Sequence, residues 1–254
     1  MELKEQVVLV TGGSRGLGEA IVRQFVEEGA KVVINYFSSK ERAESIAESL
    51  GANRAIAIQA DVRDAKSVET MFARAKEYFN KPITTIVNNA LIDFSFNGDD
   101  RKKLDTIGWE DYHTQLQGSV QAVLHTMQAG REDMVAQNFG RIISIGTNLV
   151  QNPVVPYHDY NTAKSALIGM TRSLAKELGT NGISVNMVSG GLLRTTDASK
   201  ATPDVVFDVI EESTPLQKVT TPEDVAKTVL FFASPWADAV TGQNLIVDGG
   251  LVMQ

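Results

Sequence analysis

The chain has 254 residues, of which 43% are hydrophobic, and its formal net charge is −7. This length and apolar content suffice for one α/β domain with a sizeable core, and no linker or low-complexity segment divides the chain. The acidic balance argues against nucleic-acid and anionic-membrane partners, which require a basic surface. The absence of cysteine excludes disulfides, thiolate ligands and a cysteine nucleophile.

Neither a membrane span nor a metal site is expected. No stretch approaches the roughly 18 apolar residues of a spanning helix, and the segment Met1–Gln6 is not a signal peptide. The three histidines have no acidic ligand cluster near them in the sequence. A cytoplasmic protein without a metal is therefore the prediction.

Short apolar runs alternate along the chain with longer amphipathic stretches. This alternation predicts a Rossmann-like, doubly wound parallel sheet of about seven strands with helices on both faces. Because ligands of such sheets bind at the carboxyl ends of the strands, Gly12, Asn88, Thr147 and Gly190, which each follow a strand, should share one edge. The predicted strands are Val7–Val10, Lys31–Phe37, Arg54–Gln59, Ile83–Val87, Arg141–Ile145, Ile183–Val188 and Asn244–Val247, and the predicted helices lie near 39–50, 65–79, 109–137, 158–179 and 221–233.

A glycine-rich turn joins the first strand to a helix that continues through apolar residues at helical spacing. Backbone N–H groups at such a helix N-terminus bind a pyrophosphate where small residues let it approach. The position of the turn near the start of the strand and helix pattern favours cofactor binding over a plain tight turn. The turn consists of Thr11, Gly12, Gly13, Ser14, Arg15, Gly16, Leu17 and Gly18.

Tyr160 and Lys164 form the most informative pair in the sequence. Their spacing of four places the two side chains one turn apart on the same face of a helix. A fixed cation favours the ionised form of a phenol, whose free pKa is about 10, so Tyr160 could exchange a proton with an alcohol or a ketone. Such pairs also occur on solvated helix faces, and the other motifs are what favour catalysis here.

Together these features resemble the short-chain dehydrogenase/reductase family, from the glycine turn to the C-terminus. The similarity is greatest to its β-ketoacyl-acyl-carrier-protein reductase branch. In that family the fold is a single domain, and residues 1–90 correspond mainly to the dinucleotide-binding half. The motifs that carry the resemblance are Thr11–Gly18, Asp61-Val62, Asn88-Asn89-Ala90, Tyr160 with Lys164, Val185–Val188, Pro215-Leu216, Pro222–Ala226 and Val240–Gly250.

The resemblance implies that a ketone is reduced by hydride from NADPH, with Tyr160 giving the proton and Lys164 holding the nicotinamide ribose. Thr147, 13 residues before Tyr160, stands where the family has its catalytic serine. A hydroxyl there can donate to the carbonyl oxygen as negative charge develops. Ser144 is a competing hydroxyl but a poorer match. Gln115 replaces a family Asn that is associated with a helix distortion and a proton-relay water, and its role stays open.

Cofactor preference follows from the end of the second strand. NAD enzymes of this fold place an acid there, whereas Lys31–Lys40 contains none. Arg15 can pair with a 2′-phosphate, and Ser38 and Ser39 can offer hydroxyl and N–H groups, so NADPH is favoured over NADH. A surface charge at Arg15 and a mere N-cap at Ser38 are the alternatives. The remaining contacts implied by the family are Asp61 and Val62 at the adenine, Asn88 and Ala90 at its ribose, and Leu193 and Thr195 at the carboxamide.

The substrate is less well defined. The resemblance favours a 3-oxoacyl thioester, but Asn138 and Asn181 stand where acyl-carrier-protein reductases commonly have basic residues. A coenzyme A ester, another small carbonyl compound, a sugar-like substrate, and a weakly catalytic NADPH-binding sensor or scaffold all stay open. Residues 190–213 are predicted to form a substrate lid. Residues 91–108 are predicted to be a solvated loop rather than part of the pocket entrance, and Val240–Gln254 resembles the segment through which relatives form tetramers.

Overall fold

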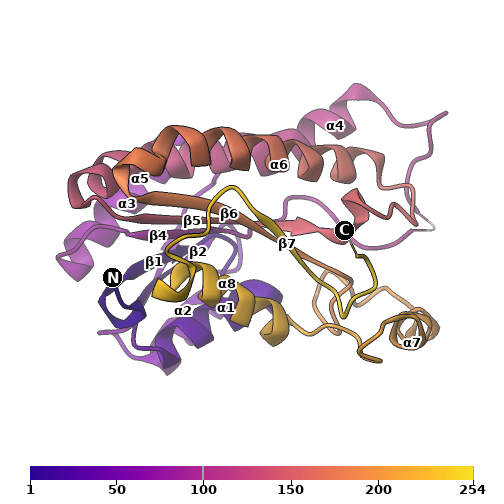
Figure 1. Cartoon of the computed structure of the whole chain (residues 1–254), viewed down its shortest axis with the longest axis horizontal. Helices are drawn as coiled ribbons and strands as arrows, with labels where there is room; N and C mark the ends of the chain where they lie inside the picture. Colours follow the sequence, from indigo (N-terminus) through magenta and orange to yellow (C-terminus); the bar gives the residue numbers. More distant parts are fainter. Residues whose placement is uncertain (99, 254) are drawn as a thin grey trace.

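The computed structural model describes residues 1–98 and 100–253, and its strands form a seven-stranded parallel sheet in the order β3-β2-β1-β4-β5-β6-β7 (Figure 1). Asp99 and Gln254, which belong to two of the segments predicted above, lie outside the described residues. The strands are β1 Val7–Val10, β2 Lys31–Tyr36, β3 Ala55–Gln59, β4 Thr85–Asn88, β5 Gly140–Thr147, β6 Ile183–Gly190 and β7 Asn244–Val247. The helices are α1 Gly16–Glu27, α2 Lys40–Leu50, α3 Ala65–Phe79, α4 Trp109–Leu116, α5 Ala122–Gln137, α6 His158–Leu178, α7 Asp204–Ser213 and α8 Pro222–Ala233.

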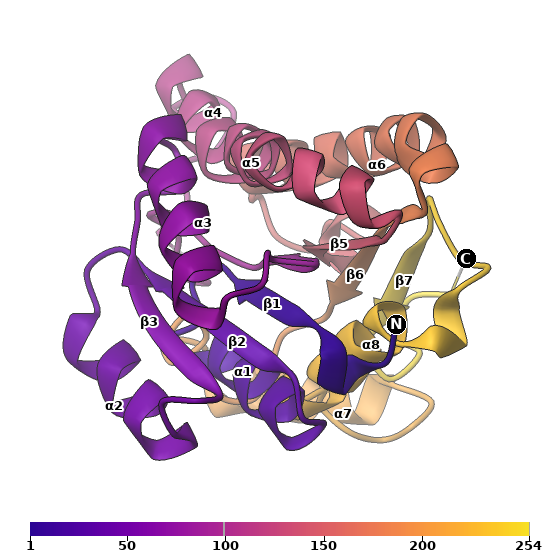
Figure 2. The same cartoon turned by 90° about the vertical axis from the view of Figure 1, so that its left-hand side faces the viewer.

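Helices cover both faces of the sheet, as the alternating pattern predicts. Figure 2 shows α3, α5 and α6 on one face and α1, α2 and α8 on the other, and Figure 1 shows α7 beyond the carboxyl ends of the strands. The direction in which strands are added reverses between β1 and β4. Ligands of doubly wound sheets bind at this reversal, so the fold class is confirmed and the position of a site is set.

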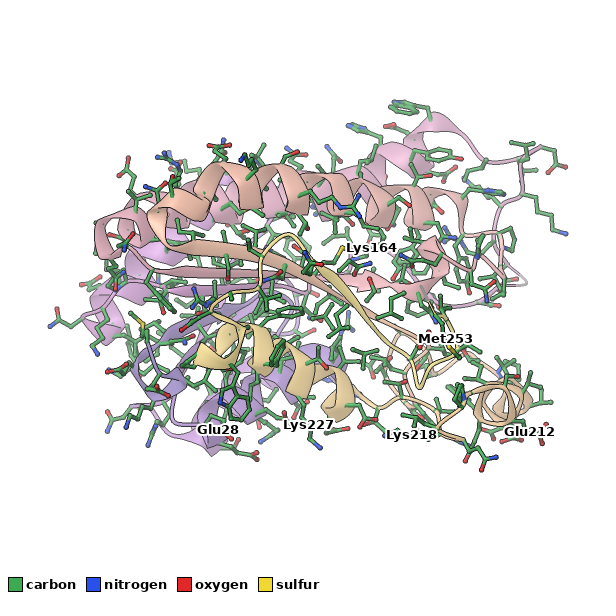
Figure 3. All side chains as sticks on the ribbon, in the orientation of Figure 1. Glu28, Lys164, Glu212, Lys218, Lys227 and Met253 are labelled. Atoms are coloured by element: carbon green, nitrogen blue, oxygen red, sulfur yellow. The ribbon has the colours of Figure 1, made fainter. Side chains whose placement is uncertain are left out.

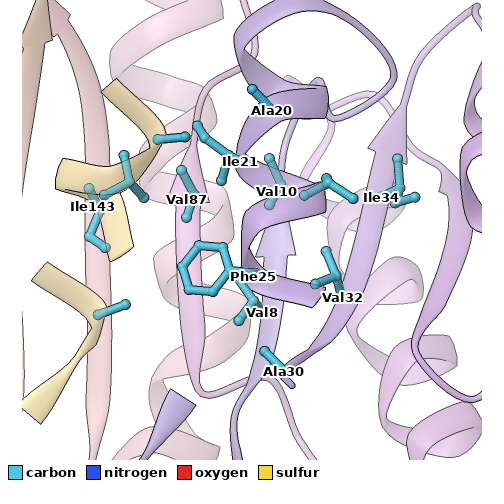
Figure 4. Packing of buried hydrophobic residues seen from close by; sticks show 14 of the residues in the cluster. Val8, Val10, Ala20, Ile21, Phe25, Ala30, Val32, Ile34, Val87 and Ile143 are labelled. Carbon is cyan, nitrogen blue, oxygen red and sulfur yellow. The ribbon is translucent and has the colours of Figure 1, made fainter. Parts of the chain in front are cut away.

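The core explains why the first strand is apolar at every position. All four residues of β1 are buried, because helices cover both faces of a parallel sheet. On the α1 face, Val8 and Val10 belong to one buried cluster with Ile21 and Phe25, none of which is exposed to solvent (Figure 4). This packing fixes the start of α1, and therefore the glycine turn, against the end of β1.

Three strands, β4, β5 and β6, end later than the apolar pattern predicts. β5 and β6 stay paired through Gly146 opposite Ser189 and Thr147 opposite Gly190. Backbone hydrogen bonds, rather than apolar side chains, carry the ladder at these small residues. Thr147 and Gly190 are therefore the last residues of their strands instead of the first residues after them, and the same holds for Asn88 in β4.

The predicted helix at 109–137 is interrupted. A π turn, Gln117–Gln121, separates α4 from α5. Such turns insert a residue into the helix and are frequent at functional sites. The helix distortion that the family associates with an Asn is thus present in a chain that has Gln115. Among the described residues, no helix has both the length and the apolar composition needed to cross a membrane.

Candidate active site

The glycine turn is closely packed against the end of β4. A Cβ atom on Gly18 would overlap the carbonyl oxygen of Gly12, so no larger residue fits there. The Thr11 hydroxyl accepts hydrogen bonds from the backbone N–H groups of Asn89, at 2.9 Å, and Ala90, at 3.0 Å. These contacts tie the first residue of the glycine turn to the segment that follows β4.

One cavity, of about 620 Å³, extends from this turn to α6. Its volume lies in the range of small-molecule and cofactor clefts. The predicted site residues that line it are Gly12, Ser14, Arg15, Gly16, Leu17, Gly18, Ser38, Ser39, Asp61, Val62, Ala90, Thr147, Tyr160, Lys164 and Leu193.

Asn88 and Thr195, which the family pattern assigns to the cofactor, do not line this cavity. The Asn88 side chain is buried, and its Oδ1 accepts a hydrogen bond from the hydroxyl of Thr126 at 2.8 Å. Thr195 is exposed. The neighbouring residues Asn89 and Thr196 line the cavity instead. Contact of Asn88 and Thr195 with a cofactor therefore stays a prediction.

The far end of the cavity is lined by residues that end or follow β2 and β3. β2 ends at Tyr36, and no carboxylate follows before Ser38 and Ser39. Ser39 is the N-cap of α2, yet its side chain makes no capping hydrogen bond. Arg63 donates to both oxygens of Asp61, and two of these hydrogen bonds, at 2.9 and 3.2 Å, reach Oδ2; the bonding lowers the pKa of the Asp61 carboxyl. The acid at this end is thereby held by an arginine.

Helix α6 brings Tyr160 and Lys164 to the opposite end of the cavity. The Lys164 ammonium lies 5.7 Å from the centroid of the Tyr160 ring, in keeping with their spacing of one turn. It donates a hydrogen bond to the carbonyl oxygen of Ile145 at 2.8 Å, and Figure 3 shows Lys164 between α6 and the sheet. Both side chains are almost inaccessible, since Tyr160 is 4% exposed and Lys164 is 5% exposed.

Burial controls the ionisation of both groups. It raises the pKa of Tyr160 above that of an ordinary phenol, and the neighbouring Thr147 hydroxyl acts in the opposite direction. Burial also lowers the pKa of Lys164 to about 8. The sequence predicts a phenol whose pKa is lowered by the lysine, but here the ammonium faces Ile145 and the burial of the phenol outweighs the other effects. Tyr160 is consequently protonated at neutral pH, the form a proton donor needs.

Thr147 supplies the second hydroxyl at this end of the cavity. It is the last residue of β5, it is 5% exposed, and its Oγ1 accepts a hydrogen bond from the backbone N–H of Leu149 at 3.2 Å. Ser144 lies within the sheet, in register with Asn88 and Met187, and does not line the cavity. Of the two hydroxyls weighed from the sequence, Thr147 is the one next to Tyr160.

Gln115 does not reach the cavity. Its Nε2 donates a hydrogen bond to the carbonyl oxygen of Ile92 at 3.1 Å, which ties α4 to the segment after β4. A separate space of about 10 Å³ lies beside Lys164, with Asn88 and Ser119 of the π turn among its lining residues. This volume corresponds to about one water molecule. Asn88 can serve as a partner for such a water, because its Nδ2 is buried without a hydrogen-bond partner among the described residues.

Residues 91–96, after β4, line the cavity beside Tyr160, so the prediction of a solvated loop is wrong for this part of 91–108 and holds for the exposed residues 102–106. The ring of Phe94 stacks on that of Tyr160, with centroids 4.4 Å apart and an interplanar angle of 24°. Phe96 meets the same ring edge-on at 5.7 Å. The only hint in the sequence is the pair of aromatic residues placed directly after a strand that ends at the ligand edge.

Polar contacts hold this aromatic cover in place. Arg101 donates to Asp159, next to Tyr160, at 2.7 Å, and its guanidinium lies 4.4 Å from the centroid of the Phe94 ring. The backbone N–H of Phe96 donates to the carbonyl oxygen of Ala198 at 3.2 Å, within the predicted lid. Residues 91–98 and 191–203 therefore cover the Tyr160 end of the cavity together, and the second half of the predicted lid is helix α7.

Known proteins share both this fold and this sequence pattern. A family model described as Enoyl-(Acyl carrier protein) reductase matches residues 12–252. The chain is also 35% identical, over 250 residues, to the 3-oxoacyl-acyl-carrier-protein reductase FabG of Staphylococcus aureus strain Mu50, covering 96% of this chain and 97% of that protein. The chain belongs to the short-chain dehydrogenase/reductase family.

Other relatives cover the chain equally well. The 3-oxoacyl-acyl-carrier-protein reductase of Synechocystis is 34% identical over 256 residues, covering 99% of this chain and 98% of that protein. A blue fluorescent protein from a metagenomic library, solved in complex with NADPH, has a TM-score of 0.86 at 34% identity and full coverage of both chains. A double mutant of a Serratia marcescens short-chain dehydrogenase/reductase has a TM-score of 0.86 at 30% identity, covering 99% of both chains.

Proposed function

We propose that this oxidoreductase uses NADPH to reduce a ketone to a secondary alcohol, and that its substrate is a 3-oxoacyl thioester. One observation carries the proposal. The hydroxyls of Tyr160 and Thr147 lie together with the Lys164 ammonium at one end of a cavity whose other end begins at a glycine turn. Two hydroxyls can hold a carbonyl oxygen that gains negative charge, and one of them can protonate it.

The residues along the cavity fit a nicotinamide dinucleotide. The glycine turn gives a pyrophosphate access to backbone N–H groups at the start of α1, and Asp61 and Val62 line the end where an adenine would lie. The lack of an acid after β2, together with Arg15, Ser38 and Ser39, favours the 2′-phosphate form. The NADPH bound to the 34% identical metagenomic protein supports the same choice.

Each catalytic side chain has a defined task in this proposal. When bound, NADPH supplies the hydride. Thr147 donates a hydrogen bond to the substrate oxygen, and Tyr160, held protonated by its burial, donates the proton. Lys164 is placed to return a proton to Tyr160, and the one-water space lined by Asn88 and Ser119 also borders Lys164. We propose that Gln115 supports this relay by holding the helix beside the π turn.

The walls beside Tyr160 favour an apolar acyl chain over a sugar. Ile92, Phe94, Phe96 and Leu149 line the cavity there. Such a surface offers few partners for the hydroxyls of a sugar, and each unpaired polar group would lose its hydrogen bonds to water on binding. The 3-oxoacyl-acyl-carrier-protein activity named for the relatives agrees with this choice.

The positions of Asn138 and Asn181 bear on which carrier delivers the acyl chain. Asn138 ends α5 and Asn181 lies just after α6, so both precede the strands that begin at Gly140 and Ile183. They therefore lie at the amino edge of the sheet, opposite the cavity, and neither can pair with an acidic carrier protein as a basic residue would. We propose that the enzyme accepts thioesters of coenzyme A as well as of an acyl carrier protein.

A second candidate is reduction of a carbon–carbon double bond, which the description of the matching family model suggests. That reaction delivers its proton to carbon, whereas Thr147 and Tyr160 are arranged to serve one oxygen. A third candidate, a weakly catalytic NADPH-binding sensor or scaffold, conflicts with the burial of the complete Tyr160 and Lys164 pair. Ketone reduction is therefore the proposal that uses the Thr147 and Tyr160 hydroxyls and the Lys164 ammonium together.

We further propose that the protein is a cytoplasmic homotetramer. Trp236, which is 84% exposed, and Leu245 of β7, which is 43% exposed, place apolar surface in and beside the C-terminal segment. Apolar surface of this kind is typical of association sites. The particle mass in solution tests this assignment.

A substrate panel tests the proposed reaction. The purified enzyme is given NADPH and, in turn, acetoacetyl-coenzyme A, acetoacetyl carrier protein, crotonyl-coenzyme A and a ketose, and the loss of NADPH absorbance is measured. We expect turnover of the acetoacetyl thioesters with formation of the 3-hydroxy product. Turnover of crotonyl-coenzyme A alone would support double-bond reduction, and inactivity toward every compound would favour the sensor or scaffold.

A further inference from the structure

Two arginines from different elements converge on one carboxylate oxygen at the adenosine end of the cavity. Arg15 immediately precedes α1, and Arg42 is the third residue of α2. Their Nη1 atoms lie 3.6 Å and 2.6 Å from the same atom, Oδ2 of Asp197. Asp197 belongs to the 191–203 segment, far from both arginines in the sequence.

This carboxylate stands at the mouth of the cofactor groove. Asp197 lines the cavity together with Arg15, Ser38 and Ser39. The preceding residue, Thr196, lies over the glycine turn, since a Cβ on Gly16 would be 3.3 Å from the Cβ of Thr196. The end of the second strand is where the ribose 2′ position of a dinucleotide is recognised in this fold. An anionic oxygen held by two guanidinium groups is therefore found where a 2′-phosphate would arrive.

The chemistry of the contact is that of phosphate recognition. Guanidinium groups match the oxygens of phosphates as well as those of carboxylates, and a phosphate carries more negative charge than a carboxylate. The Asp197 carboxyl is ionised at neutral pH, because its hydrogen bond with Arg42 and the charges of Arg42, Arg15 and Lys200 lower its pKa. All three partners are largely exposed to solvent, so this ion pair is weak enough for a more highly charged anion to replace it.

We propose that Arg42 is a second ligand of the cofactor's 2′-phosphate beside Arg15, and that Asp197 competes with this phosphate for both arginines. The proposal rests on the proposed use of NADPH and adds two determinants of cofactor specificity. Arg42 strengthens binding of the 2′-phosphorylated cofactor only. Asp197 weakens this binding, because the 2′-phosphate must displace the carboxylate from the two guanidinium groups before it can bind there.

The test measures binding of 2′,5′-ADP by calorimetry, since this fragment carries the 2′-phosphate and needs no turnover. Adenosine 5′-monophosphate serves as the matched fragment that lacks only the 2′-phosphate. Arg42→Gln is compared with Lys40→Gln. This control also removes one positive charge, two residues before Arg42, but Lys40 pairs with Glu44 and not with Asp197. Asp197→Asn is compared with Asp204→Asn at the start of α7. All proteins are measured at one ionic strength, and thermal unfolding verifies that each is folded.

We expect Arg42→Gln to lower the affinity for 2′,5′-ADP by roughly tenfold, the effect of one exposed charge-assisted contact. The affinity for adenosine 5′-monophosphate should change by less than about twofold. Asp197→Asn should strengthen 2′,5′-ADP by roughly threefold or more and leave adenosine 5′-monophosphate nearly unchanged. Lys40→Gln and Asp204→Asn should shift both fragments by less than about twofold, the size of a screened remote charge.

Two results would overturn the inference. If Arg42→Gln weakens 2′,5′-ADP no more than Lys40→Gln does, Arg42 is not a phosphate ligand. If Asp197→Asn does not strengthen 2′,5′-ADP, no competition exists. Failure of the proposed NADPH preference has a different signature, because the unmodified enzyme would then bind 2′,5′-ADP no better than adenosine 5′-monophosphate.

Discussion

Replacing Thr147 with Val tests the proposed catalytic arrangement at the position where the chain has Thr in place of the family's serine. Valine keeps nearly the shape of threonine but exchanges the hydroxyl for a methyl group. Thr147 is 5% exposed at the end of β5, so the replacement fits the site and water cannot take the place of the hydroxyl freely. We expect the protein to fold and the substrate oxygen to lose one hydrogen-bond donor.

The expected losses can be estimated separately for catalysis and for stability. Removing one donor to a developing oxyanion lowers kcat by about 10²–10³, or roughly 2.7–4 kcal/mol of transition-state stabilisation. In the folded protein, the backbone N–H of Leu149 loses its acceptor at 3.2 Å, which costs about 1 kcal/mol of unfolding free energy. The pKa of Tyr160 should also rise further, because the Thr147 hydroxyl lowers it.

The assay is kcat with saturating NADPH and acetoacetyl thioester, accompanied by denaturant unfolding. Thr147→Ser restores the hydroxyl and should stay within about tenfold of the parent kcat, well short of the loss expected for an absent donor. Ser144→Ala, inside the sheet, should leave kcat nearly unchanged. A Thr147→Val enzyme with near-parent kcat would refute the assignment of Thr147 as the oxyanion donor.

Three further substitutions test other parts of the structure. Gly18→Ala should destabilise the fold by about 1–3 kcal/mol or more, because its Cβ would overlap a backbone oxygen. The control Gly169→Ala, whose Cβ would have nothing within 4 Å, should stabilise the fold by about 0.5–1 kcal/mol. Equal unfolding midpoints for the two variants would contradict this. Lys164→Met removes a group whose pKa falls from 10.5 to about 8 on folding, so the unfolded chain keeps this proton to a higher pH than the folded protein does. The unfolding free energy of the parent, measured by denaturant titration, should therefore rise relative to that of the variant between about pH 8 and 10.5, by roughly 3 kcal/mol. A pH-independent difference would mean that Lys164 is not desolvated. Gln115→Asn should keep turnover at or above the parent rate if the relay merely tolerates Gln, and a collapse of kcat would show that the relay depends on the Gln115 contact with Ile92.

The order of elements was predictable because it depends on local patterns. Apolar runs such as Val7–Val10, buried on both faces, and the glycine turn that follows mark a parallel sheet and its ligand edge. The positions of Tyr160 and Lys164 on one helix face also follow from their spacing alone. The sequence does not indicate where β5 and β6 end, because small residues there are held by backbone pairing and leave no apolar signal.

Features that depend on contacts between distant segments could not be predicted. The π turn at Gln117–Gln121 lies inside a helical stretch without a proline to mark the interruption, so the sequence looks unbroken. The stacking of Phe94 on Tyr160 joins a loop to a helix by aromatic packing that no local pattern specifies. The convergence of Arg42 on Asp197 likewise joins two exposed charges, which the sequence alone treats as solvated.

The most direct test of the central claim is the effect of Tyr160→Phe on NADPH-dependent reduction of an acetoacetyl thioester. The substitution removes only the phenolic hydroxyl, so NADPH binding, measured by fluorescence, should be retained while kcat falls by about 10²–10⁴, the contribution of a general acid. An enzyme that retained near-parent turnover with phenylalanine at this position would contradict the proposed mechanism.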